Sequence, residues 1–122
     1  MPILEIEIVT RPAEVLRSDL AAEIADRAGE VFGSAPGATW ARVHTLPAES
    51  YAENGGGPPA GVYPVFVSVL KSRLPDATGL EREARQLAET VGRTCSRHPE
   101  NVHILYLPEG AGRVAFGGNV IR

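Results

Sequence analysis

Pro2 is the residue of this chain with the most distinctive chemistry available to it. It follows Met1 and opens the run 2–9, in which apolar residues alternate with glutamates. Removal of Met1 would leave Pro2 with a free secondary amine at the start of an ordered strand, where it could act as a general base or a nucleophile. A free α-amine titrates at roughly 7.7–8 in model peptides, and an apolar pocket with nearby guanidinium groups would lower its pKa.

Arginine supplies almost all of the positive charge, because Lys71 is the only lysine. A guanidinium presents a planar fork that matches a carboxylate. Three arginines lie within or just after expected strands, where each could offer this fork to a carboxylate: Arg11, Arg42 and Arg73. For any one of them the alternative is an ordinary solvated arginine at the end of a strand.

The helices and strands that would position these residues are predicted from hydrophobic periodicity and from the Pro and Gly residues that interrupt it. Alternation predicts strands, and an apolar residue at every third or fourth position predicts helices. The expected elements are a strand at 3–9, a helix that begins near Pro12 and ends at Gly33, a strand at 40–46, an irregular connection at 47–62, a strand at 64–70, a helix that begins after Asp76, and a strand at 101–107.

A shift of about sixty residues superimposes the second half of this pattern on the first. Pro2 then falls on Pro64, and Arg11 falls on Arg73. We therefore expect one domain over 1–122, with repeat one at about 2–57 and repeat two at about 64–122. Each repeat joins two parallel strands through a right-handed helical crossover. The prediction is an α/β fold with a four-stranded mixed sheet, two helices on one of its faces, and a partner subunit on the other.

Composition excludes several classes of function. The net charge of −3 and the absence of a basic stripe argue against nucleic-acid binding. No apolar run approaches the ~18 residues of a membrane helix, so no membrane partner is expected. Cys95 is the only cysteine, which excludes an internal disulfide, and the three histidines lack metal-ligand spacing. With no secretory signal at the start, the expected location is the cytoplasm.

The amino-terminal proline and the duplicated β-α-β unit resemble the tautomerase superfamily. The first half is similar to 4-oxalocrotonate tautomerase in the Pro2-Ile3 start, in Arg11 after the first strand, and in Arg42-Val43. The run Arg42-Val43-His44 also resembles 5-carboxymethyl-2-hydroxymuconate isomerase. The strand at 102–106, with Val114 and Phe116 after it, looks more like macrophage migration inhibitory factor.

The resemblance implies a homotrimer whose sites lie near subunit interfaces, with the terminal proline at the base of each site. It implies a small substrate that bears a carboxylate, and neither a metal nor an organic cofactor. The catalytic residues would be Pro2, Arg42 and Arg11. The substrate-binding residues would be Arg73, His103, Tyr106, Val114 and Phe116. For His103, Tyr106 and Phe116, ordinary packing within the structure is the open alternative.

Two departures from the family pattern shape the predicted function. The stretch 34–37 has no lysine where macrophage migration inhibitory factor has one, and 37–39 has no acidic residue to activate water. We therefore expect a tautomerase or isomerase that moves a proton in a small 2-oxo or 2-hydroxy-unsaturated acid, with Pro2 as general base. The alternatives are a decarboxylase, hydratase or dehalogenase on the same scaffold, which Arg73 suggests, or a non-catalytic trimeric binding protein.

Overall fold

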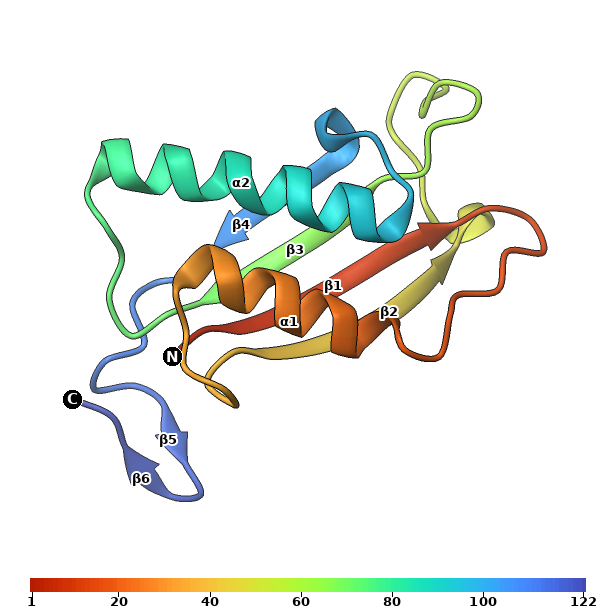
Figure 1. The fold of residues 1–122 in the computed structure, drawn as a ribbon. Coiled ribbons are helices and arrows are strands. Elements are labelled where there is room, and N and C mark those ends of the chain that lie inside the picture. The colour runs from red at the N-terminus through yellow and green to blue at the C-terminus, as the bar shows by residue number, and fades with distance from the viewer.

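The computed structural model describes all 122 residues, from Met1 to Arg122. Two β-α-β units follow one another along the chain, and a short hairpin ends it (Figure 1). The first unit consists of β1 (Ile3–Thr10), α1 (Leu20–Phe32) and β2 (Trp40–Pro47). The second unit consists of β3 (Val65–Leu70), α2 (Ala77–Cys95) and β4 (Val102–Tyr106). The hairpin strands are β5 (Ala115–Phe116) and β6 (Asn119–Val120).

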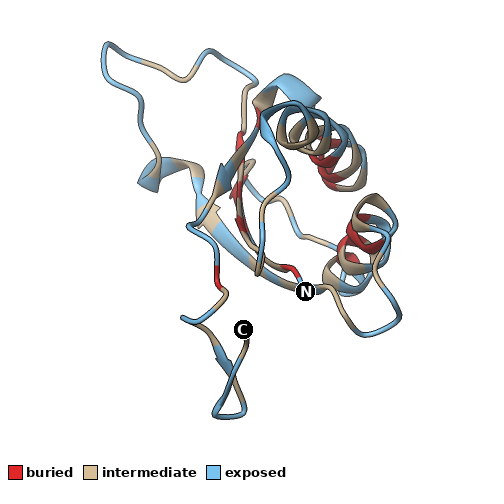
Figure 2. Cartoon of the chain, turned by 90° about the vertical axis from the view of Figure 1, so that its left-hand side faces the viewer, coloured by how far each residue is buried: buried red, intermediate tan, exposed pale blue.

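The four long strands form one mixed sheet in the order β2-β1-β3-β4. Pairing is parallel within each unit and antiparallel between β1 and β3, where Ile3 lies opposite Leu70. Both helices cover the same face, and no layer of secondary structure covers the other face, which we call the open face (Figure 2). The predicted α/β architecture is confirmed. None of the helices is long and apolar enough to cross a membrane.

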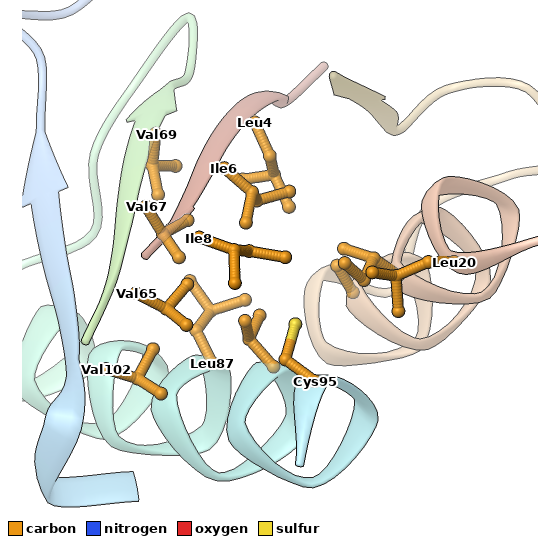
Figure 3. Close-up of a cluster of buried hydrophobic side chains, with 13 residues drawn as sticks. Leu4, Ile6, Ile8, Leu20, Val65, Val67, Val69, Leu87, Cys95 and Val102 are labelled. Atoms are coloured by element: carbon orange, nitrogen blue, oxygen red, sulfur yellow. The ribbon is translucent and has the colours of Figure 1, made fainter. Parts of the chain in front are cut away.

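The alternation of apolar residues with glutamates along β1 decides which face of the strand is buried. Leu4, Ile6 and Ile8 have no exposed surface, whereas Glu5 and Glu7 on the opposite face are exposed. The three apolar side chains meet residues of β3 and of both helices in one hydrophobic cluster (Figure 3). Burial of aliphatic side chains on this scale is the main favourable contribution to folding.

Helix α2 forms where the sequence predicts it. The Asp76 side chain caps it by accepting a hydrogen bond from the Gly79 N–H at 2.8 Å. Leu87 and Val91, from the predicted apolar stripe, are fully buried. The strand ends agree to within one residue, and β4 begins at Val102 because residues 99–101 form a 3₁₀ turn.

The predicted start of the first helix is wrong. Helix α1 begins at Leu20, not near Pro12, because residues 11–14 form a turn. Ala13 adopts a positive φ of 62°, and the Arg11 carbonyl accepts from the Glu14 N–H at 3.0 Å. The Glu14 carboxylate also accepts from the Arg11 N–H at 2.9 Å, which fixes the turn. The connection at 47–62 is irregular, as predicted, apart from one 3₁₀ turn and an isolated bridge.

Replacing a helical glycine by alanine is expected to change the free energy of unfolding in opposite directions at two positions. A Cβ at Gly92 would lie 2.7 Å from the Arg97 carbonyl oxygen, whereas one at Gly29 would make ordinary contacts with Thr39 at 3.8 Å. We expect Gly92→Ala to lower the free energy of unfolding by about 1–3 kcal/mol through overpacking. Gly29→Ala should instead raise it by up to ~1 kcal/mol, because alanine favours the helix. Urea unfolding of the two variants checks this, and equal effects would contradict it.

Candidate active site

Pro2 lies at the edge of the molecule where the start of β1 meets the ends of β3 and β4 and the end of α1, on the left of Figure 1. We call this the Pro2 edge. Pro2 is buried, and its carbonyl accepts a hydrogen bond from the Trp40 N–H at 3.1 Å. Because side chains alternate along a strand, the Pro2 ring lies on the helix-covered face with Leu4. The backbone thus fixes the direction of the Pro2 nitrogen.

Arg73 belongs to the Pro2 edge. Since Ile3 pairs with Leu70 in the antiparallel ladder, the segment that leaves β3 runs beside Pro2. Arg73 is three residues beyond Leu70, is exposed, and has no ion-pair or hydrogen-bond partner among its side-chain groups. A free guanidinium at this edge is available to a carboxylate.

Arg11 lies at the opposite end of β1, nine residues from Pro2, which corresponds to roughly 30 Å along an extended strand. Its guanidinium pairs with Glu14 at 3.1 Å, donates to the Ser96 carbonyl at 3.2 Å, and lies 5.4 Å from the centre of the Tyr63 ring. The structure therefore does not bring Arg11 and Pro2 together within one chain. The two residues flank opposite ends of β1, and the antiparallel pairing of the repeats places the end of β3 beside Pro2.

The edge that carries Pro64, the repeat mate of Pro2, is filled by a buried ion pair. Arg97 donates to both Glu14 carboxylate oxygens at 3.0 and 2.9 Å, and its side chain is 2% exposed. It also donates to three backbone carbonyls, those of Tyr63, Cys95 and Val9. The Arg97 hydrogen bonds outweigh partial burial and lower the pKa of Glu14 to about 2. With an amide nitrogen at Pro64 and this network beside it, the second edge is structural.

Arg42 lies on the open face, where its Nη1 is 2.5 Å from the Glu5 carboxylate. The pair is half exposed and lines a hollow of about 350 Å³. The hollow is lined by Ile3, Glu5, Arg42, Ser68, Leu70 and Leu107. Because Ile3 is the neighbour of Pro2, the hollow begins at the Pro2 edge and extends across the sheet.

His103 and Tyr106 point to different faces of the sheet. His103 is exposed on the open face and packs at a tilt against Phe66, with ring centres 5.3 Å apart. The pair lies level with the middle of β1 and away from Pro2. Tyr106 faces the helices at the Pro2 edge, and its hydroxyl donates to Glu83 at 2.8 Å. Burial, and then the adjacent carboxylate, raise the pKa of Tyr106 above its ordinary value, so the phenol stays protonated.

Val114 and Phe116 reach the Pro2 edge from the carboxy-terminal segment. The Gly110 N–H donates to the Lys71 carbonyl at 2.8 Å. This hydrogen bond holds the segment before Val114 against the end of β3. Phe116 then packs edge to face against Trp40, with ring centres 5.3 Å apart. The β5–β6 hairpin projects from the sheet on this side (Figure 1). The aromatic pair therefore borders the edge that carries Pro2.

The sequence reasoning missed a cluster beside this edge. Lys71 pairs with Glu83 at 2.6 Å and lies 5.0 Å from the centre of the Phe32 ring. One signal was present, because Glu83 occupies the same helical face as Leu80 and Leu87. A carboxylate within an apolar stripe must find a partner when it is buried.

The other reactive side chains have structural roles. Cys95 is 5% exposed, and burial raises its pKa to about 11, so the thiol is neutral. No group of three or more His, Cys, Asp or Glu side chains is placed to hold a metal ion.

Comparison with known proteins identifies the fold. No protein-family model matches the chain, and no curated protein matches it in sequence. Among solved structures, it is similar to a macrophage migration inhibitory factor-like protein from Entamoeba histolytica, at 13% identity and a TM-score of 0.70, over 98% of this chain and 97% of that one. A fused 4-OT solved as a symmetric trimer gives 12% identity and a TM-score of 0.75, over 97% and 94% of the two chains.

A malonate semialdehyde decarboxylase inhibited by 3-bromopropiolate gives 13% identity and a TM-score of 0.68, over 96% of this chain and 92% of that one. These likenesses extend over nearly the whole length of both chains. This chain therefore shares the fold of these solved structures.

Proposed function

We propose that this protein is a tautomerase or isomerase that moves a proton in a small 2-oxo or 2-hydroxy-unsaturated acid, with Pro2 as its general base. The observation that carries the proposal is the placement of Pro2. It is buried at the start of a central strand, on the edge that also carries the unpaired Arg73. The proposal requires Met1 to be removed, since only then is the Pro2 nitrogen an amine.

The chemistry follows from this placement. A buried amine resists protonation, so its pKa falls toward the working pH, where a general base is most effective. The fixed ring direction saves entropy when the nitrogen is aligned with a carbon acid. Arg73 would bind the substrate carboxylate, and Arg42, once it exchanges Glu5 for substrate, would stabilise the enolate oxygen. Tyr106, Val114 and Phe116 would form the wall of the site.

A homotrimer is part of the proposal. The open face carries exposed Trp40 and Leu105, which a partner subunit would cover. The fused 4-OT neighbours were solved as trimers. Arg11 and His103 lie too far from Pro2 to act in their own chain, so their predicted roles require that they enter the site of a neighbouring subunit.

A decarboxylase is the second candidate, because Arg73 is free beside Pro2 and a malonate semialdehyde decarboxylase shares the fold. It would release carbon dioxide from a 3-oxo acid, with Pro2 in its charged form. The two candidates therefore differ in the protonation state of Pro2. Loss of activity below the pKa of Pro2 would support proton abstraction, and loss of activity above it would support decarboxylation.

Covalent labelling tests the proposal without knowledge of the natural substrate. A solved neighbour of the same fold, at 16% identity and a TM-score of 0.73, is described as inactivated by 2-oxo-3-pentynoate. We expect the same compound to modify this protein once per chain, with the adduct on the peptide that begins at Pro2. Labelling only at Lys71 or Cys95, or no labelling at all, would contradict a reactive Pro2 amine.

Removing the free guanidinium should weaken substrate binding. A hydrogen bond to a charged group contributes about 1.5–3 kcal/mol, so we expect Arg73→Ala to raise KM for a 2-oxo acid by about 10- to 100-fold. Arg85→Ala, at an exposed position of α2, serves as the matched control and should leave KM unchanged. Steady-state kinetics would measure KM in both variants. Equal KM values in the two would show that Arg73 does not bind the substrate.

A further inference from the structure

An ion pair beside Pro2, Lys71 with Glu83, has no part in the function proposed above. Lys71 and Glu83 form an ion pair at 2.6 Å, with side chains only 18% and 13% exposed. The other Glu83 oxygen accepts from the Tyr106 hydroxyl at 2.8 Å, and the Lys71 ammonium lies 5.0 Å from the centre of the Phe32 ring. We call Lys71, Glu83, Tyr106 and Phe32 the Lys71 cluster.

The strand register places this cluster next to Pro2. The β1–β3 ladder pairs Ile3 with Leu70, so continuing it by one residue sets Pro2 opposite Lys71. Opposed residues in antiparallel strands have Cα atoms about 4.5–5.5 Å apart. Leu4 and Val69 are both buried on the helix-covered face, and alternation puts the side chains of Pro2 and Lys71 on that same face.

We propose that the Lys71–Glu83 pair is a balanced positioning element, in which Glu83 offsets the Lys71 cation at the Pro2 amine and so keeps the proton affinity of the amine close to the value that burial gives it. The inference rests on the proposed role of Pro2 as a base. The Lys71 cation opposes protonation of the amine, and the Glu83 anion favours it. Tyr106 donates to the second Glu83 oxygen and so holds that carboxylate in place beside Lys71.

The Lys71–Glu83 pair is partly buried, whereas the other ionisable groups named below are exposed. Arg73, in the same segment as Lys71, is exposed. In the first repeat, Glu30 on the last turn of α1 is exposed, and the Glu5–Arg42 pair lies on the open face. Water screens exposed charges much more than buried ones. The carboxy-terminal segment contributes Glu109 and Arg113, which are also exposed.

A charge-sign test separates this role from a purely structural one. Lys71→Met would leave the Glu83 anion uncompensated and should raise the pKa of the Pro2 amine by about one unit. Glu83→Gln would leave the Lys71 cation uncompensated and should lower the same pKa by a similar amount. In the double variant the two effects should largely cancel. A pair that stabilises only the fold, and that lies too far from the Pro2 nitrogen to act on its charge, predicts no such opposition of sign.

The pKa is measured directly by NMR titration of protein labelled with [¹⁵N]proline, after intact mass has shown that Pro2 is the terminal residue. Glu89→Gln, at an exposed position of the same helix, is the matched control and should leave the titration unchanged. Lys71→Arg keeps the charge and should restore a value near that of the unmodified protein. Glu83→Gln retains its hydrogen-bonding groups, so it tests the proposal even if Lys71→Met does not fold.

Shifts of opposite sign in the two single variants would support the proposal. Shifts of the same sign, or none beyond that of Glu89→Gln, would overturn it. The titration does not depend on turnover, so the two proposals fail in different ways. Opposite shifts in the pKa of the Pro2 amine, without any enzymatic activity, would argue against the proposed function alone. Enzymatic activity without these pKa shifts would argue against the role of the Lys71 cluster alone.

Discussion

Replacing Pro2 by alanine is expected to lower kcat/KM for the ketonisation of an enol substrate by about 10²–10⁴-fold, the usual contribution of a positioned general base. The variant loses the ring that fixes the direction of the nitrogen and the secondary amine itself. The site keeps Arg73, Arg42 and the hollow beside them, so KM should change little. Steady-state kinetics with a panel of 2-oxo acids would measure both parameters.

Pro64→Ala is the matched control, because Pro64 begins the equivalent strand of the second repeat. Its nitrogen is an amide inside the chain, so the folded variant should retain kcat/KM. Pro64 is fully buried, and some loss of stability is expected. Full activity in Pro2→Ala, or equal losses in both variants, would exclude Pro2 as the base.

Replacing Arg97 by methionine should lower the free energy of unfolding by about 3–5 kcal/mol, which is typical when one partner of a buried ion pair is removed. The Glu14 carboxylate would lose two charge-assisted hydrogen bonds, and three backbone carbonyls would lose their donor. Arg27→Met, which breaks an exposed pair with Glu23, is the control and should cost less than ~1 kcal/mol. Urea denaturation compares the two variants, and similar losses would contradict the account.

The same network predicts how stability depends on pH. The folded-state pKa of Glu14 is about 2, below its ordinary value of 4.5. A depressed carboxyl pKa stabilises the folded protein above the unfolded value, and this contribution, at most about 3 kcal/mol, is lost as pH falls from about 4.5 to about 2. In Arg97→Met the loss over this window should be much smaller. An unchanged acid dependence in the variant would show that Arg97 is not its source.

Much of the fold could be predicted because local signals agreed with the tertiary structure. Alternation in β1 identified its buried face, and the Asp76 cap and apolar stripe located α2. The start of α1 could not be found in this way, because Glu14 is drawn into an ion pair with Arg97, 83 positions along the chain. No pattern local to residues 11–19 reports that contact.

The candidate site was predictable to a smaller extent. The expected strand at 3–9 already separated Arg11 from Pro2, but the sequence did not show that Arg73 lies beside Pro2. That depends on the antiparallel pairing of β1 with β3, a long-range choice with no local signature. The Lys71–Glu83 pair was missed for the same reason, since its partners come from different elements.

Intact mass of the protein purified from its native host is the most direct test of the central claim, that the Pro2 amine is the base. The account predicts a mass below that of the printed sequence by one methionine residue, with Pro2 at the terminus. A mass that includes Met1 would make the Pro2 nitrogen an amide, which cannot abstract a proton, and would contradict the claim.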